Sequence, residues 1–81
     1  MRSLLERPED LGRFVHRIRT DARMTQRQLA DALGTSQRYL SELEAGKPKR
    51  IDANYFDVLR KLGIELYAET VASDPDDPGN D

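Results

Sequence analysis

The sequence contains no cysteine and no tryptophan, and its only aromatic residues are three tyrosines and two phenylalanines. The lack of cysteine excludes a disulfide framework, a Cys-ligated zinc site and a thiol nucleophile. No apolar run approaches the roughly 18–20 residues that span a bilayer, and residues 1–7 lack the long apolar stretch of a signal peptide. We therefore expect a cytoplasmic protein without a membrane partner, and 81 residues leave room for one small domain.

The charged residues are unevenly distributed along the chain. The formal net charge is −2, but residues 69–81 carry five acids and no base, whereas residues 11–50 hold nine bases and four acids. A basic segment joined to an acidic tail is typical of nucleic-acid-binding proteins. A merely solvated basic face explains the same pattern equally well, so charge alone does not decide between them.

Amphipathic periodicity predicts four helices, over residues 8–22, 26–33, 37–45 and 53–62. Pro8 suits a first helical turn, Thr25 and Gln28 form a capping box, and Gly34 suits a left-handed helix end. Residues 64–69 alternate apolar and polar side chains, which predicts a half-buried strand. The residues expected to face inward are apolar: Leu11, Phe14, Val15, Ile18, Ala22, Leu29, Ala30, Leu33, Leu40, Leu43, Phe56, Leu59 and Leu62.

The two short helices over 26–33 and 37–45, joined by a glycine turn, indicate a helix-turn-helix unit. At about 100° per residue, the outer arc of the second helix holds Gln37, Arg38 and Ser41. Glutamine pairs with adenine, arginine pairs with guanine, and serine pairs with either base in the major groove. These three side chains are therefore candidate base contacts, with an ordinary solvated helix face as the alternative.

Further polar residues flank the candidate base contacts. Gln26 begins the first helix of the unit, where unpaired backbone N–H groups can hold a phosphate. Lys47, Lys49 and Arg50 follow the second helix and can contact the DNA backbone on the other side. The alternatives are a plain capping-turn role for Gln26 and a plain solvated loop for the three bases.

Residues 24–47, with the sequence MTQRQLADALGTSQRYLSELEAGK, resemble the Cro/C1 (Xre) family of helix-turn-helix repressors. The resemblance covers about residues 11–62. It implies that Gln26 binds phosphate and that Gln37, Arg38 and Ser41 face bases. It also matches Arg19 and Glu44 to the family's ion pair between its first and third helices. Both residues flank the apolar stripes of their helices, in agreement with that pairing.

Residues 62–66, with the sequence LGIEL, resemble the end of HipB-type antitoxins, in which a short strand pairs between two subunits. That resemblance implies a HipA-type kinase toxin as partner and repression of the protein's own operon. One face of the expected strand carries Ile64, Leu66 and Ala68. A single strand in an otherwise helical chain leaves an open edge, which a second copy of the strand would satisfy.

The expected fold is therefore all-α: a lambda-repressor-like domain of four helices, with a short C-terminal strand that pairs across a homodimer. We expect an N-terminal arm over 1–7, the DNA-binding domain over 8–63, the dimerisation strand over 64–70 and a disordered acidic tail over 71–81. The expected function is repression through a palindromic double-stranded DNA operator, as the antitoxin of a HipBA-like operon. The alternatives are a stand-alone Xre-type regulator and a pure protein-interaction module.

Catalytic and metal-binding signals are absent from the sequence. It has no glycine-rich phosphate loop and no nucleophile beside a base. His16 is the only histidine and is expected at the surface without metal co-ligands. Glu42 and Glu44 are two residues apart on a helix, so their carboxylates diverge. We expect no enzyme, no cofactor and no metal.

Overall fold

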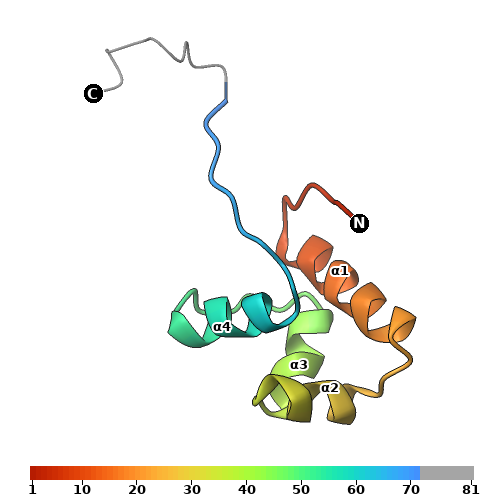
Figure 1. The fold of residues 1–81 in the computed structure, drawn as a ribbon. Coiled ribbons are helices and arrows are strands. Elements are labelled where there is room, and N and C mark those ends of the chain that lie inside the picture. Colours follow the sequence, from red (N-terminus) through yellow and green to blue (C-terminus); the bar gives the residue numbers. More distant parts are fainter. Residues whose placement is uncertain (72–81) are drawn as a thin grey trace.

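The computed structural model describes residues 1–71, which form four α-helices and no strand (Figure 1). The helices are α1 (Pro8–Asp21), α2 (Gln26–Leu33), α3 (Gln37–Glu44) and α4 (Ala53–Lys61). The prediction of an all-α domain is confirmed, and these helices depart from the expected ranges by one residue at most. No helix within residues 1–71 is long and apolar enough to cross a membrane.

Side chains at the helix starts satisfy backbone N–H groups that have no partner inside the helix. The predicted capping box is present at α2. The Gln28 backbone N–H donates to Thr25 Oγ1 over 3.1 Å, and the Thr25 backbone N–H donates to Gln28 Oε1 over 2.9 Å. Ser36 caps α3 and Asp52 caps α4 through one bond each, which their side chains accept from the backbone N–H of Tyr39 and of Tyr55. These local bonds fix where each short helix begins.

The turn between α2 and α3 depends on a residue in the left-handed region of backbone space. Gly34 has φ +70°, and its N–H donates to the Asp31 carbonyl over 3.2 Å. Glycine adopts this conformation without steric cost. The predicted glycine turn of the helix-turn-helix unit is therefore confirmed.

The buried core is gathered around α3, which lies between α1, α2 and α4 (Figure 1). From α3 itself, Leu40 is fully buried and Leu43 is nearly so. The buried hydrophobic side chains within residues 1–71 are Leu11, Val15, Leu29, Ala30, Leu33, Leu40, Leu43, Val58 and Leu59. The face of α3 opposite Leu40 and Leu43 consequently remains open to solvent.

Several expected core residues lie closer to the surface than predicted. Phe56 was expected to face inward, but it is 47% exposed, and Val58 lies in the core instead. The hydrophobic side chains that α4 and its C-cap residue pack against the core are therefore those of residues 55, 58, 59 and 62, the spacing of a helical stripe. Ala22 is exposed, since α1 ends at Asp21. Phe14 and Ile18 are half-buried at the stripe's edge.

Helices α1 and α3 come into very close contact at Gly12. A Cβ atom at this position would lie 2.6 Å from the Glu44 carbonyl oxygen and 2.7 Å from the Leu43 carbonyl oxygen. Atoms at such distances overlap, so only glycine permits this approach. Gly12 thereby sets the distance between α1 and the C-terminal end of α3.

The segment after α4 has no regular structure in the single chain. The Ile64 N–H donates to the Leu59 carbonyl over 2.9 Å and so finishes the end of α4. Beyond this bond the chain runs away from the helices, on the side of the N-terminal arm (Figure 1). The strand expected over 64–69 is not formed here, because no second strand faces it. The tail expected over 71–81 lies, apart from Val71, outside the described residues.

Candidate nucleic-acid interface

The outer face of α3 presents the three candidate base contacts. Gln37, Arg38 and Ser41 are all exposed, whereas Leu40 and Leu43 are buried on the other side of the same helix. The Arg38 side chain is 88% exposed, so its guanidinium extends into solvent. The helix therefore places one cation, one amide and one hydroxyl on a single outward arc.

A carboxylate beside this arc joins two cations. Glu42 Oε2 lies 3.4 Å from Arg38 Nε, and Glu42 Oε1 accepts a hydrogen bond from Lys49 Nζ. These bonds, first from Lys49 and then from Arg38, hold the pKa of the Glu42 carboxyl below its ordinary value. The basic loop after α3 thus folds back onto the helix through Lys49.

The Lys49 ammonium also lies 4.5 Å from the ring centroid of Tyr39, a cation–π contact. Its side chain is only 12% exposed, in contrast to Lys47 and Arg50, which are exposed in the same loop. Lys49 must therefore leave a carboxylate before it can contact a phosphate. Sequence spacing could not have revealed this contact, since it depends on how the loop returns to α3.

A second polar cluster lies where α1, α2 and α3 meet. Glu44 Oε2 accepts a hydrogen bond from Arg19 Nε over 2.7 Å, and Glu44 Oε1 accepts one from Arg19 Nη2 over 3.0 Å. Gln26 Nε2 donates to the same Oε1 over 3.1 Å. Arg19 Nη1 donates to the Met24 carbonyl over 2.9 Å. The residues matched to the family's ion pair therefore form a bidentate bridge that also holds Gln26.

Burial and hydrogen bonding act in opposite directions on Glu44, whose side chain is 5% exposed. Burial raises the pKa of this carboxyl, but the hydrogen bonds from Arg19, Gln26 and His16 outweigh burial and leave the pKa below its ordinary value. The same bridge raises the pKa of the Arg19 guanidinium. Glu44 is therefore charged in the folded protein at neutral pH.

His16, expected to be a plain surface residue, takes part in this cluster. Its ring is half exposed, and its Nδ1 lies 3.1 Å from Glu44 Oε1 and 3.2 Å from Arg19 Nη2. Its position three residues before Arg19, on the same face of α1, was the available signal. No group of three potential metal ligands occurs within residues 1–71.

Gln26 is the first residue of α2, where the backbone N–H groups have no partner within the helix. A carboxamide nitrogen carries two donor hydrogens. One of them is donated to Glu44, and the other can be donated to an anion at the N-terminal end of α2. This arrangement combines a side-chain donor with the positive end of a helix dipole.

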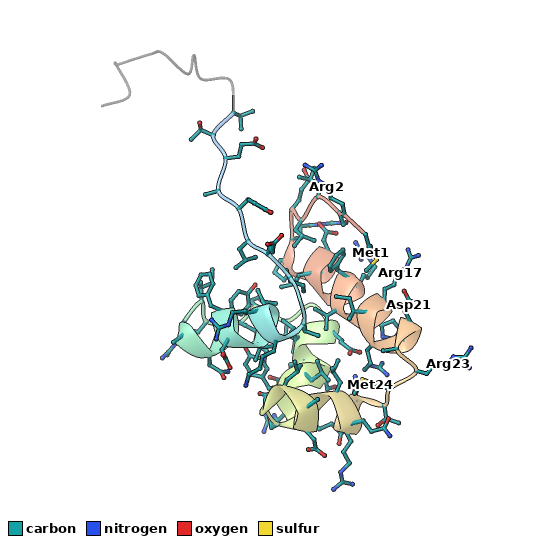
Figure 2. The ribbon with its side chains drawn as sticks, viewed as in Figure 1. Met1, Arg2, Arg17, Asp21, Arg23 and Met24 are labelled. Carbon is teal, nitrogen blue, oxygen red and sulfur yellow. The ribbon has the colours of Figure 1, made fainter. Side chains whose placement is uncertain are left out.

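More basic side chains extend along α1 and the turn that follows it (Figure 2). Arg17 Nε lies 3.6 Å from Asp21 Oδ2, so its charge is partly neutralised. Arg23 has φ +57° and projects from the turn between α1 and α2 (Figure 2). A non-glycine residue in this conformation costs on the order of 1 kcal/mol, and no residue pattern around Arg23 indicates this conformation.

Comparison with known proteins places this arrangement in a family. Residues 10–62 match the family described as "Helix-turn-helix domain". The chain is 32% identical over 66 residues to an uncharacterized HTH-type transcriptional regulator, y4mF, of Sinorhizobium fredii, with 82% of this chain and 87% of that protein covered.

Solved structures show the same fold at lower identity. A chain of the HipA–HipB–O2–O3 complex aligns with a TM-score of 0.66 and 20% identity, over 88% of this chain and 99% of that one. A chain of the HipB–O4 20-mer complex aligns with a TM-score of 0.69 and 20% identity, over 86% and 99%. At this identity the likeness concerns the fold.

Proposed function

The chain belongs to the helix-turn-helix domain family, and from this premise we propose that it is a dimeric DNA-binding transcriptional repressor that reads a palindromic operator. The observation that carries the proposal is the division of α3 into two faces. Leu40 and Leu43 hold the helix in the core, while Gln37, Arg38 and Ser41 are directed to solvent. A helix fixed by one face and polar on the other is suited to the major groove.

The outer arc of α3 supplies the base contacts. Arg38 donates to O6 and N7 of guanine, Gln37 pairs with N6 and N7 of adenine, and Ser41 contacts either base. The Arg38 side chain is 88% exposed, so no other side chain covers it. These contacts set the sequence preference.

Phosphate contacts fix the position of the protein on the duplex. Gln26 uses its second amide hydrogen together with the N-terminal N–H groups of α2. Lys47 and Arg50 use exposed side chains, and Lys49 joins them by exchanging Glu42 for a phosphate. The two sets of contacts lie on opposite sides of α3.

The dimer is proposed to form through residues 64–69. In the single chain Leu66 and Ala68 are exposed and Ile64 is half-buried, so the apolar face of this segment is largely exposed to solvent. Antiparallel pairing with the same segment of a second copy would satisfy the open edges and suits two-fold symmetry. Such a dimer sets two copies of α3 about 34–36 Å apart, one DNA turn.

A toxin partner is the finer part of the proposal. The likeness of the fold to a chain of the HipA–HipB–O2–O3 complex favours an antitoxin that also holds a HipA-type kinase. The relationship to an HTH-type transcriptional regulator supports the alternative of a stand-alone regulator. Co-purification with a kinase encoded beside this gene would favour the antitoxin. A protein-interaction module without DNA binding is the third candidate.

The test begins with a duplex selected by the wild-type protein from a pool of randomised sequences. Arg38→Ala is expected to weaken binding to the selected duplex by about 1–3 kcal/mol and to lose discrimination at one base pair. Arg60→Ala is the matched control, because Arg60 is also an exposed arginine paired with an acid on its own helix. Equal losses on selected and scrambled duplexes would contradict base reading, and no binding at low salt would favour the interaction module.

A further inference from the structure

Glu42 is the acidic residue closest to the candidate base contacts on α3. It follows Arg38 by four residues, so the two side chains lie about 40° apart around the helix axis. Its carboxylate bonds Arg38 through one oxygen and Lys49 through the other. Two cations that the proposed function assigns to DNA, one to a base and one to a phosphate, therefore share a single negative charge.

The Arg38–Glu42 pair of this arrangement lies at the surface, where ion pairs contribute little to folding. Its effect is on the electrostatic field that DNA meets. The Arg38, Lys49 and Glu42 side chains together carry one net positive charge instead of two. Since the pKa of Glu42 lies below its ordinary value, the carboxylate stays ionised throughout the neutral range.

We propose that Glu42 is a specificity-determining residue, which suppresses binding to DNA of arbitrary sequence by holding Arg38 and Lys49. The inference rests on the proposed DNA-binding function and adds a residue that sets its selectivity. Lys49 must give up the carboxylate before it contacts a phosphate, and Arg38 weakens its 3.4 Å contact with Glu42 when its guanidinium turns toward a base. Glu42 also repels phosphates that approach the outer arc without a matching base sequence.

The exchange favours the correct sequence because the two outcomes differ in strength. On a matching site, Arg38 gains a bidentate pair with guanine that replaces its carboxylate contact. On an arbitrary site, Arg38 gains only attraction to phosphates, which salt screens. The free energy lost when the contacts with Glu42 are given up is therefore regained on the matching site and not on the arbitrary one.

The test compares Glu42→Gln with Asp57→Asn. Asp57 is the matched control, since on α4 it also pairs with two cations, Arg60 and Lys61, and is similarly exposed. Both variants remove one negative charge and keep the side-chain shape. Binding to the selected duplex and to a scrambled duplex of the same length is measured over a series of salt concentrations, after circular dichroism has verified folding.

For Glu42→Gln, affinity for the scrambled duplex is expected to rise about five- to tenfold at 0.1 M salt, the effect of one further phosphate contact. The slope of log K against log salt is expected to steepen by about 0.9, and the ratio of selected to scrambled affinity to fall. Asp57→Asn is expected to leave slope and ratio unchanged. A Glu42→Gln/Lys49→Gln double variant is expected to return the slope to the wild-type value.

An unchanged slope and ratio in Glu42→Gln would overturn the proposal. Equal changes in Asp57→Asn would also overturn it, because they would reveal an effect of total charge alone. If Glu42→Gln does not fold, Lys49→Gln decides: an unchanged slope on both duplexes would overturn the role of the Glu42–Lys49 bond. Failure of the wild-type protein to bind any duplex at low salt is a different result, which contradicts the proposed function itself.

Discussion

A single carboxylate, that of Glu44, connects three helices. It lies on α3, and it accepts two hydrogen bonds from Arg19 on α1 and one from Gln26 at the start of α2. The residue that positions the candidate phosphate contact is thus also a member of the buried ion pair. A change at Glu44 is therefore expected to affect both stability and DNA affinity, and the two effects need separate measurements.

The pH dependence of stability follows from the lowered pKa of Glu44. A carboxyl whose pKa is lower in the folded than in the unfolded chain stabilises the fold above its unfolded pKa, and this contribution is lost as pH falls through the folded pKa. At pH 7, Glu44→Gln is expected to cost about 2–4 kcal/mol, because Arg19 is left partly buried without its counter-charge. Below about pH 4, the difference from wild type is expected to shrink.

Urea unfolding of both proteins at pH 7 and at pH 3 measures this difference. Asp10 and Glu42 also have lowered pKa values, so both proteins lose stability in acid and only the difference reports on Glu44. Arg17→Ala/Asp21→Ala, which removes the exposed pair on α1, is the control and is expected to change stability by less than about 1 kcal/mol. An equal cost of Glu44→Gln at the two pH values would contradict the ionic origin of the stabilisation.

At the scale of elements, the approach of α1 to α3 at Gly12 is the tightest backbone contact described above. In an open helix, a Gly→Ala change stabilises by roughly 1 kcal/mol through helix propensity. At Gly12 the added methyl group would meet two carbonyl oxygens of α3 within 2.7 Å. The steric effect therefore opposes the propensity effect and is larger.

Gly12→Ala is expected to destabilise the fold by about 1–3 kcal/mol, the usual cost of overpacking. Thermal or urea unfolding checks the sign of the change. Thr20→Ala on the exposed side of α1 is the control and is expected to be nearly neutral. A stabilised Gly12→Ala protein would show that α1 and α3 separate without cost, and the close packing would then carry no energetic weight.

The helices were predictable because their signals are local. Thr25 with Gln28, Ser36, Asp52 and Gly34 act on backbone within a few residues, so the sequence indicates them directly. The burial of Phe56 was predicted incorrectly and the contact at Gly12 was not predicted, because both depend on neighbouring helices. A glycine inside a helix looks only like a weak position, and the periodicity of α4 did not show that Val58 and not Phe56 reaches the core.

The candidate site was predictable in part for the same reason. The outer arc of α3 follows from helical spacing, and Arg19 with Glu44 follows from the family resemblance. The bonds of Glu42 to Lys49 and of His16 to Glu44 connect residues 7 and 28 positions apart. The first contact depends on the path of a loop, which no pattern along the chain indicates. The second depends on helix packing, for which the spacing of His16 and Arg19 is only a partial signal.

At the scale of the whole molecule, the segment after α4 is almost entirely exposed to solvent. Within residues 64–71, only Ile64 is half-buried, and the remaining side chains are exposed. A small domain buries only a limited apolar area, so each apolar side chain left uncovered matters for its stability. The proposed pairing with a second copy would cover this surface and join two DNA-reading helices.

Truncation after Gly63 is expected to yield a folded monomer, because the buried core lies entirely within residues 11–59. Its affinity for a palindromic duplex is expected to fall about 100-fold or more, since the second half-site contact loses its high effective concentration. Sedimentation equilibrium and binding titrations measure the two effects. Truncation after Val71 is the control and is expected to leave both unchanged. A dimeric, fully active protein ending at Gly63 would contradict assembly through this segment.

The separation of α3 into a packed face and an outer face has a consequence for how the protein can evolve. Substitutions on the outer face, at 37, 38 and 41, lie away from the core and are expected to change stability by no more than about 0.5 kcal/mol each. A duplicated gene could therefore acquire a new DNA target at these positions while every intermediate remains folded. The range of DNA sequences that such duplicated proteins come to bind would then be limited by interference between the copies in regulation, and not by the stability of the fold.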